Sequence, residues 1–188
     1  MSYFPVCIDL TGATILLVGR GPQIEEKLCK LKLFGATLLR VDNITEETLS
    51  CAPAFVVVGD LEYEKAAQIN SLCKANRIPV NVVDIPALCT FYFPALITRG
   101  DLTVSISTGG KSPATAAFLR RRLEQQIPDR TDVIVDWLYE TRHFLKKEHP
   151  HISARTVLSE ATKLAFSRNR PLTEAELQEL IAKTTPSG

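Results

Sequence analysis

The 188-residue chain lacks the features that mark several specialised classes of protein. It has no apolar run near the ~18 residues that a membrane-spanning helix needs. It has no large excess of one charge, because its formal net charge is +1. Its first residues, MSYFPVCIDL, lack the basic region and the long apolar region of a signal peptide. We therefore expect a cytoplasmic protein that binds neither membranes nor nucleic acid.

The cysteines and histidines give little support for a crosslink or a metal site. The five cysteines are an odd number and contain no CxxC pair. Most of them lie in apolar segments, where a reduced cysteine packs as a small hydrophobic residue. The nearest approach to a ligand pattern is His149-Pro-His151, which has no cysteine close by. We predict no disulfide framework, no metal site and surface histidines.

The sequence does contain a regular alternation of apolar strands and helices. Strands are predicted at 14–19, 37–41, 54–58 and 78–83, with helices beginning at Pro22 and Glu62. This alternation predicts an α/β fold, with a Rossmann-like, mostly parallel sheet covered by helices. Two short strands around Gly100-Asp101 predict a hairpin that adds antiparallel strands to this sheet.

The remainder of the chain is expected to be helical. Ser112 is a good N-cap and Pro113 a good first helical residue. Thr173 with Glu176 has the capping-box pattern before another helix. We predict two domains, a Rossmann-like domain at 1–108 and a helical region at 109–188.

The glycine turn after the first strand is the central local feature. Gly19-Arg20-Gly21 follows the strand and Pro22 opens a helix, an arrangement that presents backbone N–H groups to a phosphate. The dinucleotide fingerprint has a small residue where Ile24 stands, so the motif alone is weak. The predicted cofactor-binding residues here are Gly19, Arg20, Gly21, Pro22, Gln23 and Ile24.

Further candidates follow the other strands, because ligands bind beyond the carboxyl ends of such a sheet. Asp42 lies roughly 20 positions after Gly21, where NAD-binding folds place the acid that binds the ribose hydroxyls. A cap is an equally good interpretation of Asp42, and caps or turns also account for Asp60 and Asp84. The set of predicted cofactor-binding residues is extended by Asp42, Gly59, Asp60 and Val83.

An ordered series of blocks resembles the precorrin-2 dehydrogenase family, which includes the N-terminal part of siroheme synthase. The series covers roughly residues 3–127, and its NVVD, FxFPA and STGGxSP blocks are specific in combination. The blocks are Tyr3-Phe4-Pro5 with Asp9-Leu10, Val18-Gly-Arg-Gly-Pro22 with Lys27, Ile78-Pro-Val-Asn-Val-Val-Asp84, Phe91-Tyr-Phe-Pro-Ala95, Ser105-Ile-Ser-Thr-Gly-Gly-Lys-Ser-Pro113, and Leu119-Arg120 with Leu123-Glu124.

The resemblance implies an oxidoreductase that uses NAD to convert precorrin-2 to sirohydrochlorin in siroheme biosynthesis. Some family members also insert iron into the product, a lyase reaction. The family is homodimeric, and 1–108 would bind NAD while 109–188 would serve dimerisation and the substrate cleft. The family's acid–base aspartate falls on Asp84. A tetrapyrrole with many carboxylates favours polar and basic partners. The candidates for substrate binding are Arg99, Lys111, Ser112 and Arg120.

Departures from the family pattern leave other hypotheses open. Ile24 replaces a small residue, Glu26 stands where arginine is usual, and Arg20 replaces the middle glycine. If these changes abolish NAD binding, the chain is a redox-inactive member that binds a tetrapyrrole or a partner protein. Chelatase activity without oxidation is a third hypothesis, because it needs metal and sirohydrochlorin but no NAD.

Overall fold

The computed structural model describes residues 4–184, so Tyr3 of the first block lies outside the described residues. The chain forms two compact units that divide between Phe93 and Pro94. We call them unit 1 and unit 2 and describe each by itself. None of the helices within residues 4–184 has the length and apolar character needed to cross a membrane.

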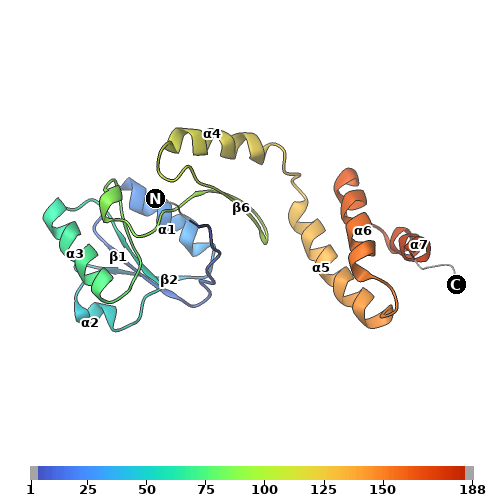
Figure 1. Cartoon of the computed structure of the whole chain (residues 1–188), viewed down its shortest axis with the longest axis horizontal. Helices are drawn as coiled ribbons and strands as arrows, with labels where there is room; N and C mark the ends of the chain where they lie inside the picture. The colour runs from blue at the N-terminus through green and yellow to red at the C-terminus, as the bar shows by residue number, and fades with distance from the viewer. Residues whose placement is uncertain (1–3, 185–188) are drawn as a thin grey trace. The chain divides into compact units, whose positions relative to one another are not determined.

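Unit 1 is built on a parallel four-stranded sheet with the order β2-β1-β3-β4 (Figure 1). The strands are β1 (Thr14–Val18), β2 (Thr37–Val41), β3 (Phe55–Val58) and β4 (Val80–Val82). The helical segments are α1 (Pro22–Lys32), α2 (Glu46–Leu49), α3 (Tyr63–Ala75) and the short 3₁₀ turn η1 (Pro86–Leu88). The Rossmann-like parallel sheet predicted from the sequence is confirmed.

Helices cover both faces of this sheet, which explains why its central strands are continuous apolar runs. On one face, Val56 and Val58 of β3 pack in a cluster with Ile69 of α3. On the other face, Val57 packs in a second cluster with Ile24 of α1. The two clusters hold α1 and α3 on opposite sides, so the loops after the strands meet at one edge.

Unit 2 begins with an antiparallel hairpin that pairs β5 (Ala95–Arg99) with β6 (Leu102–Ile106). The hairpin was predicted, but the expectation that it extends the parallel sheet is wrong, because it forms a separate two-stranded sheet. The physical reason is that its strands pack against helices of unit 2. The strands contact α4 (Pro113–Glu124), and β6 also contacts α5 (Thr131–Glu148).

The division into units therefore differs from the predicted boundary at 108/109. The hairpin belongs with the helices that follow it, whereas the prediction placed it with the parallel sheet. The roles predicted for 1–108 and 109–188 stay predictions.

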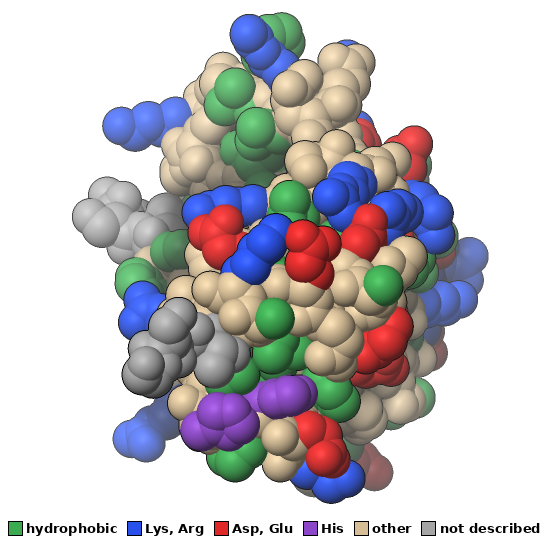
Figure 2. Space-filling view, turned by 90° about the vertical axis from the view of Figure 1, so that its right-hand side faces the viewer, with side chains coloured by type: hydrophobic (Ala, Val, Ile, Leu, Met, Phe, Trp, Pro, Cys, Tyr) green, Lys and Arg blue, Asp and Glu red, His purple; other side chains and the backbone are tan. Residues whose placement is uncertain are grey.

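The end of unit 2 consists of α6 (Ala154–Arg168) and α7 (Glu174–Thr184). The predicted capping box is confirmed, since Glu176 Oε2 accepts from Thr173 N at 2.7 Å and Thr173 Oγ1 accepts from Glu176 N at 3.4 Å. The hydrogen bond from Arg170 is the main reason why the pKa of Glu176 falls to about 2. Figure 2 shows acidic and basic side chains interspersed on this side of the molecule.

All five cysteines are free. Cys73 is buried and Cys89 half-buried, but Cys7, Cys29 and Cys51 are exposed. The expectation that most cysteines pack as small hydrophobic residues is therefore wrong. The expectation failed because a segment rich in apolar residues can still turn one of its faces, and the cysteine on it, toward solvent.

Replacing Gly100 with alanine should destabilise unit 2. Gly100 has φ +54°, and a Cβ there would lie 2.8 Å from Cβ of Asp132 in α5. Gly110 has φ +80° but open space around it, so Gly110→Ala is a matched control for backbone strain alone. We expect Gly100→Ala to cost about 1–3 kcal/mol more than the control. Thermal melts followed by circular dichroism would measure the difference, and equal melts would contradict the expectation.

Candidate functional site

The turn between β1 and α1 has the backbone geometry of a phosphate-binding turn. Gly19 has φ +82° and Gly21 has φ +123°, conformations that favour glycine. Pro22 is the first residue of α1, and no side chain caps the helix N-terminus at Gly21. The first N–H groups of α1 and its positive dipole end are therefore left for a ligand.

The loops after β1, β3 and β4 are joined by backbone hydrogen bonds. Gly59 N donates to Val18 O at 2.8 Å, Asp60 N to Arg20 O at 2.9 Å, and Val83 N to Val58 O at 2.9 Å. A Cβ on Gly59 would lie 2.6 Å from the Arg20 carbonyl oxygen, so only glycine permits this approach. The structure thus brings the predicted residues Gly19–Gly21, Gly59, Asp60 and Val83 to one edge of the sheet.

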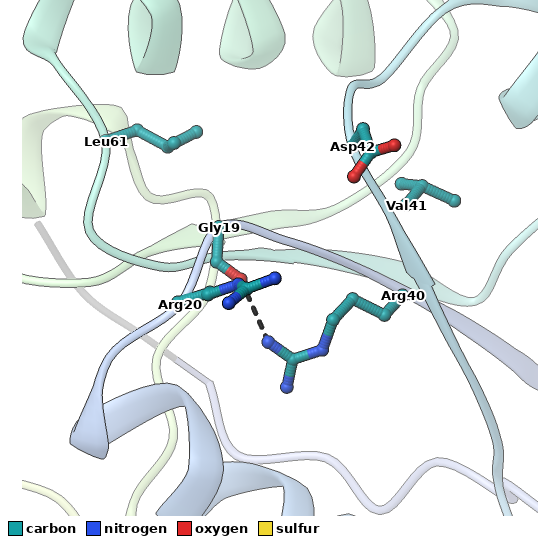
Figure 3. A pocket seen from close by; sticks show the side chains of 6 residues that line it. All are labelled: Gly19, Arg20, Arg40, Val41, Asp42 and Leu61. Carbon is teal, nitrogen blue, oxygen red and sulfur yellow. Dashed lines mark hydrogen bonds between the residues drawn. The ribbon is translucent and has the colours of Figure 1, made fainter.

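A pocket opens at this edge beside the end of β2 (Figure 3). Gly19, Arg20 and Asp42 were predicted for the site, and all three line the pocket. Arg40 also lines it but was not predicted. Its Nη1 donates to Gly19 O at 3.1 Å, and its Nη2 pairs with Glu25 at 2.5 Å. The remaining lining residues are Val41 and Leu61.

A sequence signal for Arg40 did exist. Residues two positions apart in a strand point to the same face, so Arg40 shares the face of Asp42 within the strand end that the prediction had identified. The sequence alone did not show that a cation two residues before the acid would reach back to the glycine turn.

Ile24 and Glu26, the departures that weakened the motif, do not line the pocket. The Ile24 side chain is 1% exposed and packs in the core between α1 and the sheet. Only its backbone N–H is suited to a ligand. Glu26 pairs with Lys30 at 2.6 Å along the exposed side of α1. Neither side chain therefore takes up room in this pocket.

Asp84 follows β4 at the same edge and is held in an uncommon conformation. Its φ is +59°, which few residues other than glycine adopt. Its Oδ2 accepts a hydrogen bond of 2.9 Å from Gln23 Nε2 in the first turn of α1. Gln23, predicted as a cofactor residue, thus links the glycine turn to the predicted acid–base residue.

A lysine lies one helical turn beyond Gln23. Lys27 Nζ stands 5.7 Å from the centroid of the Phe93 ring. Burial lowers the pKa of the Lys27 ammonium, while the negative charge of Asp84 acts in the opposite direction. Asp84 therefore faces a hydrogen-bond donor and a positive charge from the same helix.

Side chains behind Asp84 secure the turn that carries it. Cys89 Sγ accepts from Val82 N at 3.2 Å and donates to Val82 O at 3.1 Å. Asn81 Nδ2 donates to Phe91 O at 3.0 Å. The Phe91 ring packs 5.0 Å from the Phe55 ring in the core. The NVVD and FxFPA blocks are thus bonded to each other, and the aromatic block anchors the turn to the sheet.

The predicted substrate-binding residues all belong to unit 2. Arg99 and Arg120 are brought together, since both pair with Glu124, at 3.8 and 2.7 Å. Ser112 caps α4 by accepting from Thr115 N at 3.2 Å. Lys111 is exposed and has no ion pair among residues 4–184. Glu124 therefore partly neutralises the two arginines, and Lys111 keeps its full charge for a ligand.

Replacing Gly59 with alanine should weaken dinucleotide binding. The new Cβ would push against the Arg20 carbonyl, which is backbone and moves only with the whole glycine turn. We expect a stability loss of about 1–3 kcal/mol and a dissociation constant for NAD raised by about tenfold or more, measured by calorimetry. Gly12→Ala is the control, since Gly12 has φ +70° but no atom near its would-be Cβ. An unchanged NAD affinity in Gly59→Ala would contradict the expectation.

Comparison with known proteins gives two family matches in the order of the chain. Residues 6–95 match a family model described as putative NAD(P)-binding, and residues 99–126 match one described as sirohaem biosynthesis protein central. A solved structure described as SirC, precorrin-2 dehydrogenase, aligns with a TM-score of 0.66 at 20% identity, covering 97% of this chain and 98% of that one.

Siroheme synthases are among the similar curated proteins. The siroheme synthase of Psychrobacter sp. (strain PRwf-1) is 31% identical over 175 residues, which are 82% of this chain but 36% of that protein. The siroheme synthase of Pseudomonas aeruginosa (strain UCBPP-PA14) is 31% identical over 182 residues, 85% of this chain and 39% of that protein. The chain thus spans well under half the length of these relatives. These matches bear out the predicted resemblance: residues 6–95 are similar to the putative NAD(P)-binding family, residues 99–126 are similar to the central part of the sirohaem biosynthesis proteins, and siroheme synthases are similar over most of this chain.

Proposed function

We propose that this chain oxidises precorrin-2 to sirohydrochlorin with NAD, as a step of siroheme biosynthesis. The observation that carries the proposal is the 2.9 Å hydrogen bond between Gln23 and Asp84. This hydrogen bond holds the Asp84 carboxylate beside the first turn of α1, the helix that follows the glycine turn. A carboxylate is the kind of group that the reaction needs as a base. The match of residues 6–95 to a putative NAD(P)-binding family supports the choice of cofactor.

The residues at the edge of unit 1 fit a dinucleotide. Gly59 leaves the backbone of the glycine turn accessible, and the uncapped N-terminus of α1 suits the pyrophosphate. Asp42 lines the pocket where its carboxylate would accept hydrogen bonds from ribose hydroxyls. When bound, NAD supplies the acceptor for the hydride that leaves the macrocycle.

Asp84 would perform the acid–base part of the reaction. Oxidation of precorrin-2 removes two hydrogens, one as a hydride and one as a proton, so a base must accept that proton. The Asp84 carboxylate is exposed at the edge of the sheet, and its Oδ2 accepts the hydrogen bond from Gln23. Oδ1 would therefore take the proton, while the hydrogen bond from Gln23 keeps the carboxylate oriented.

Cationic side chains of unit 2 would bind the carboxylates of the tetrapyrrole. Lys111 carries a charge with no ion pair among the described residues, and Arg99 and Arg120 share a single carboxylate, Glu124. Cationic side chains such as these favour a substrate with many carboxylates. Ser112 would contribute by fixing the start of α4, directly after Lys111.

We also propose a homodimer in the cytoplasm. Helix α4 exposes a group of large apolar side chains of the kind that protein–protein contacts cover. Their exposed fractions are 60% for Phe118, 38% for Leu119 and 42% for Leu123. The cytoplasmic location expected from the sequence stays a prediction.

The other activities considered from the sequence are weaker proposals. The redox-inactive alternative was motivated by Ile24 and Glu26, whose side chains lie outside the pocket. Iron insertion into sirohydrochlorin stays a prediction, in which Asp84 would accept the pyrrole protons.

The test is turnover of precorrin-2 by the purified chain with saturating NAD. We expect NADH and sirohydrochlorin to form in equal amounts, followed by absorbance. Asp84→Asn should lower kcat by about 10²–10⁴-fold, because it removes the base while keeping the shape. NAD affinity should change little.

Glu26→Gln is a matched control, since it also neutralises one carboxylate of unit 1 but lies outside the pocket. It should keep its activity. No turnover by the unaltered chain would contradict the proposed function, and full activity of Asp84→Asn would contradict the role given to Asp84.

A further inference from the structure

Lys27 is a half-buried cation without a polar partner. It lies in the second turn of α1, and its ammonium has neither a hydrogen bond nor an ion pair to any residue within 4–184. Lys30 in the same helix is exposed and pairs with Glu26 at 2.6 Å. Taking an ammonium partly out of water without pairing it costs free energy. Lys27 therefore calls for a ligand in a way that Lys30 does not.

Three aromatic rings fix the place of this ammonium. Lys27 Nζ lies 5.7 Å from the centroid of the Phe93 ring, within the range of a cation–π contact. The Phe93 ring packs 5.2 Å from the Phe91 ring and 6.0 Å from the ring of Phe55, which is buried in β3. The contact with Phe93 uses no oxygen or nitrogen acceptor, so the N–H donors of a preorganised ammonium remain for a ligand.

The ammonium lies on the side of α1 that faces Asp84. Residues four positions apart are neighbours on a helix surface, and Gln23, four positions before Lys27, donates to Asp84 Oδ2 at 2.9 Å. Lys27 and Asp84 form no ion pair in the described part of the chain, although the charge of Asp84 acts on Lys27 through space. A ligand group bound to Lys27 would therefore lie beside the Asp84 carboxylate.

A substrate with many carboxylates needs a cation at this place. Asp84 is itself an anion, and like charges a few ångströms apart repel each other. Lys27 supplies a positive charge from the same helix face that holds Asp84 in place, so it would offset this repulsion. An ammonium also binds a carboxylate through charge-assisted hydrogen bonds, which are stronger than neutral ones.

We propose that Lys27 is a substrate-binding residue, whose ammonium binds one carboxylate of the tetrapyrrole and thereby places the macrocycle against Asp84. The inference rests on the proposed function for the identity of the substrate. It adds an anchor in unit 1 to the cations of unit 2, on the helix that also begins at the glycine turn.

The experiment measures the binding of sirohydrochlorin, the product of the proposed reaction, without NAD. The dissociation constant would be obtained from the change in absorbance of the tetrapyrrole. Lys27→Met keeps the length of the side chain and removes its charge. It should raise the dissociation constant by about tenfold or more, because a hydrogen bond between charged groups is lost. Lys27→Arg keeps the charge and should lose less affinity than Lys27→Met.

Lys30→Met is the matched control, since it makes the same change three residues further along α1. Because Lys30 is exposed and belongs to a surface ion pair, its loss should change the affinity for sirohydrochlorin by less than about threefold. The affinity of Lys27→Met for NAD should also change by less than about threefold, because a pyrophosphate binds at the N-terminus of a helix and not at its second turn.

A thermal melt separates ligand binding from a structural role. Burial lowers the pKa of the Lys27 ammonium, so folding disfavours its charged form. Removing that charge in Lys27→Met should therefore leave the melting temperature unchanged or raise it. A lower melting temperature together with an equal loss of affinity in Lys27→Arg would assign Lys27 to the packing of unit 1 and overturn the inference.

Three other results would also overturn it. These are an unchanged affinity for sirohydrochlorin in Lys27→Met, an equal loss in Lys30→Met, and a loss of NAD affinity as large as the loss of tetrapyrrole affinity. If the unaltered chain does not oxidise precorrin-2, the proposed function fails. The inference is still decided by the binding of sirohydrochlorin, which requires neither NAD nor turnover, and an unaltered chain that does not bind sirohydrochlorin overturns it.

Discussion

The close approach of the Gly59 backbone to the carbonyl of Arg20 is the constraint on which the site depends. A Cβ at position 59 would lie 2.6 Å from that oxygen, so the approach exists only because the residue is glycine. The hydrogen bonds from Gly59 N to Val18 O and from Asp60 N to Arg20 O follow from it. They hold the loops after β1 and β3 together and fix where the glycine turn faces.

The rest of the site is arranged around this junction. Val83 N bonds to Val58 O, which brings the loop after β4 to the same edge and with it Asp84. The core contact of Ile24 holds α1 against the sheet, so that Gln23 reaches Asp84. A bulky residue at position 24 therefore serves packing beneath the turn and leaves the ligand side open. The glycine turn and Asp84 are thus coupled through one helix.

The sequence predicted the parallel sheet and the glycine turn well, because both depend on local patterns. Buried strands are recognisable as apolar runs in the sequence. The backbone conformations at positions 21 and 22 suit glycine and proline better than most other residues. The hairpin was predicted, but its separation from the parallel sheet was not, because tertiary packing decides which apolar surface the hairpin covers. Arg40 and the bond from Gln23 to Asp84 were missed for the same reason, since each joins residues far apart in the chain.

The most direct test of the account is to map NAD onto the chain by nuclear magnetic resonance, for which a protein of 20.8 kDa is suitable. Backbone amide shifts would be followed while NAD is added. The account predicts that the largest changes fall on the amides of Gly19, Gly21, Ile24 and Gly59, with smaller ones at Asp42 and Asp84. Saturation without changes at the glycine turn, or changes confined to other segments, would contradict it.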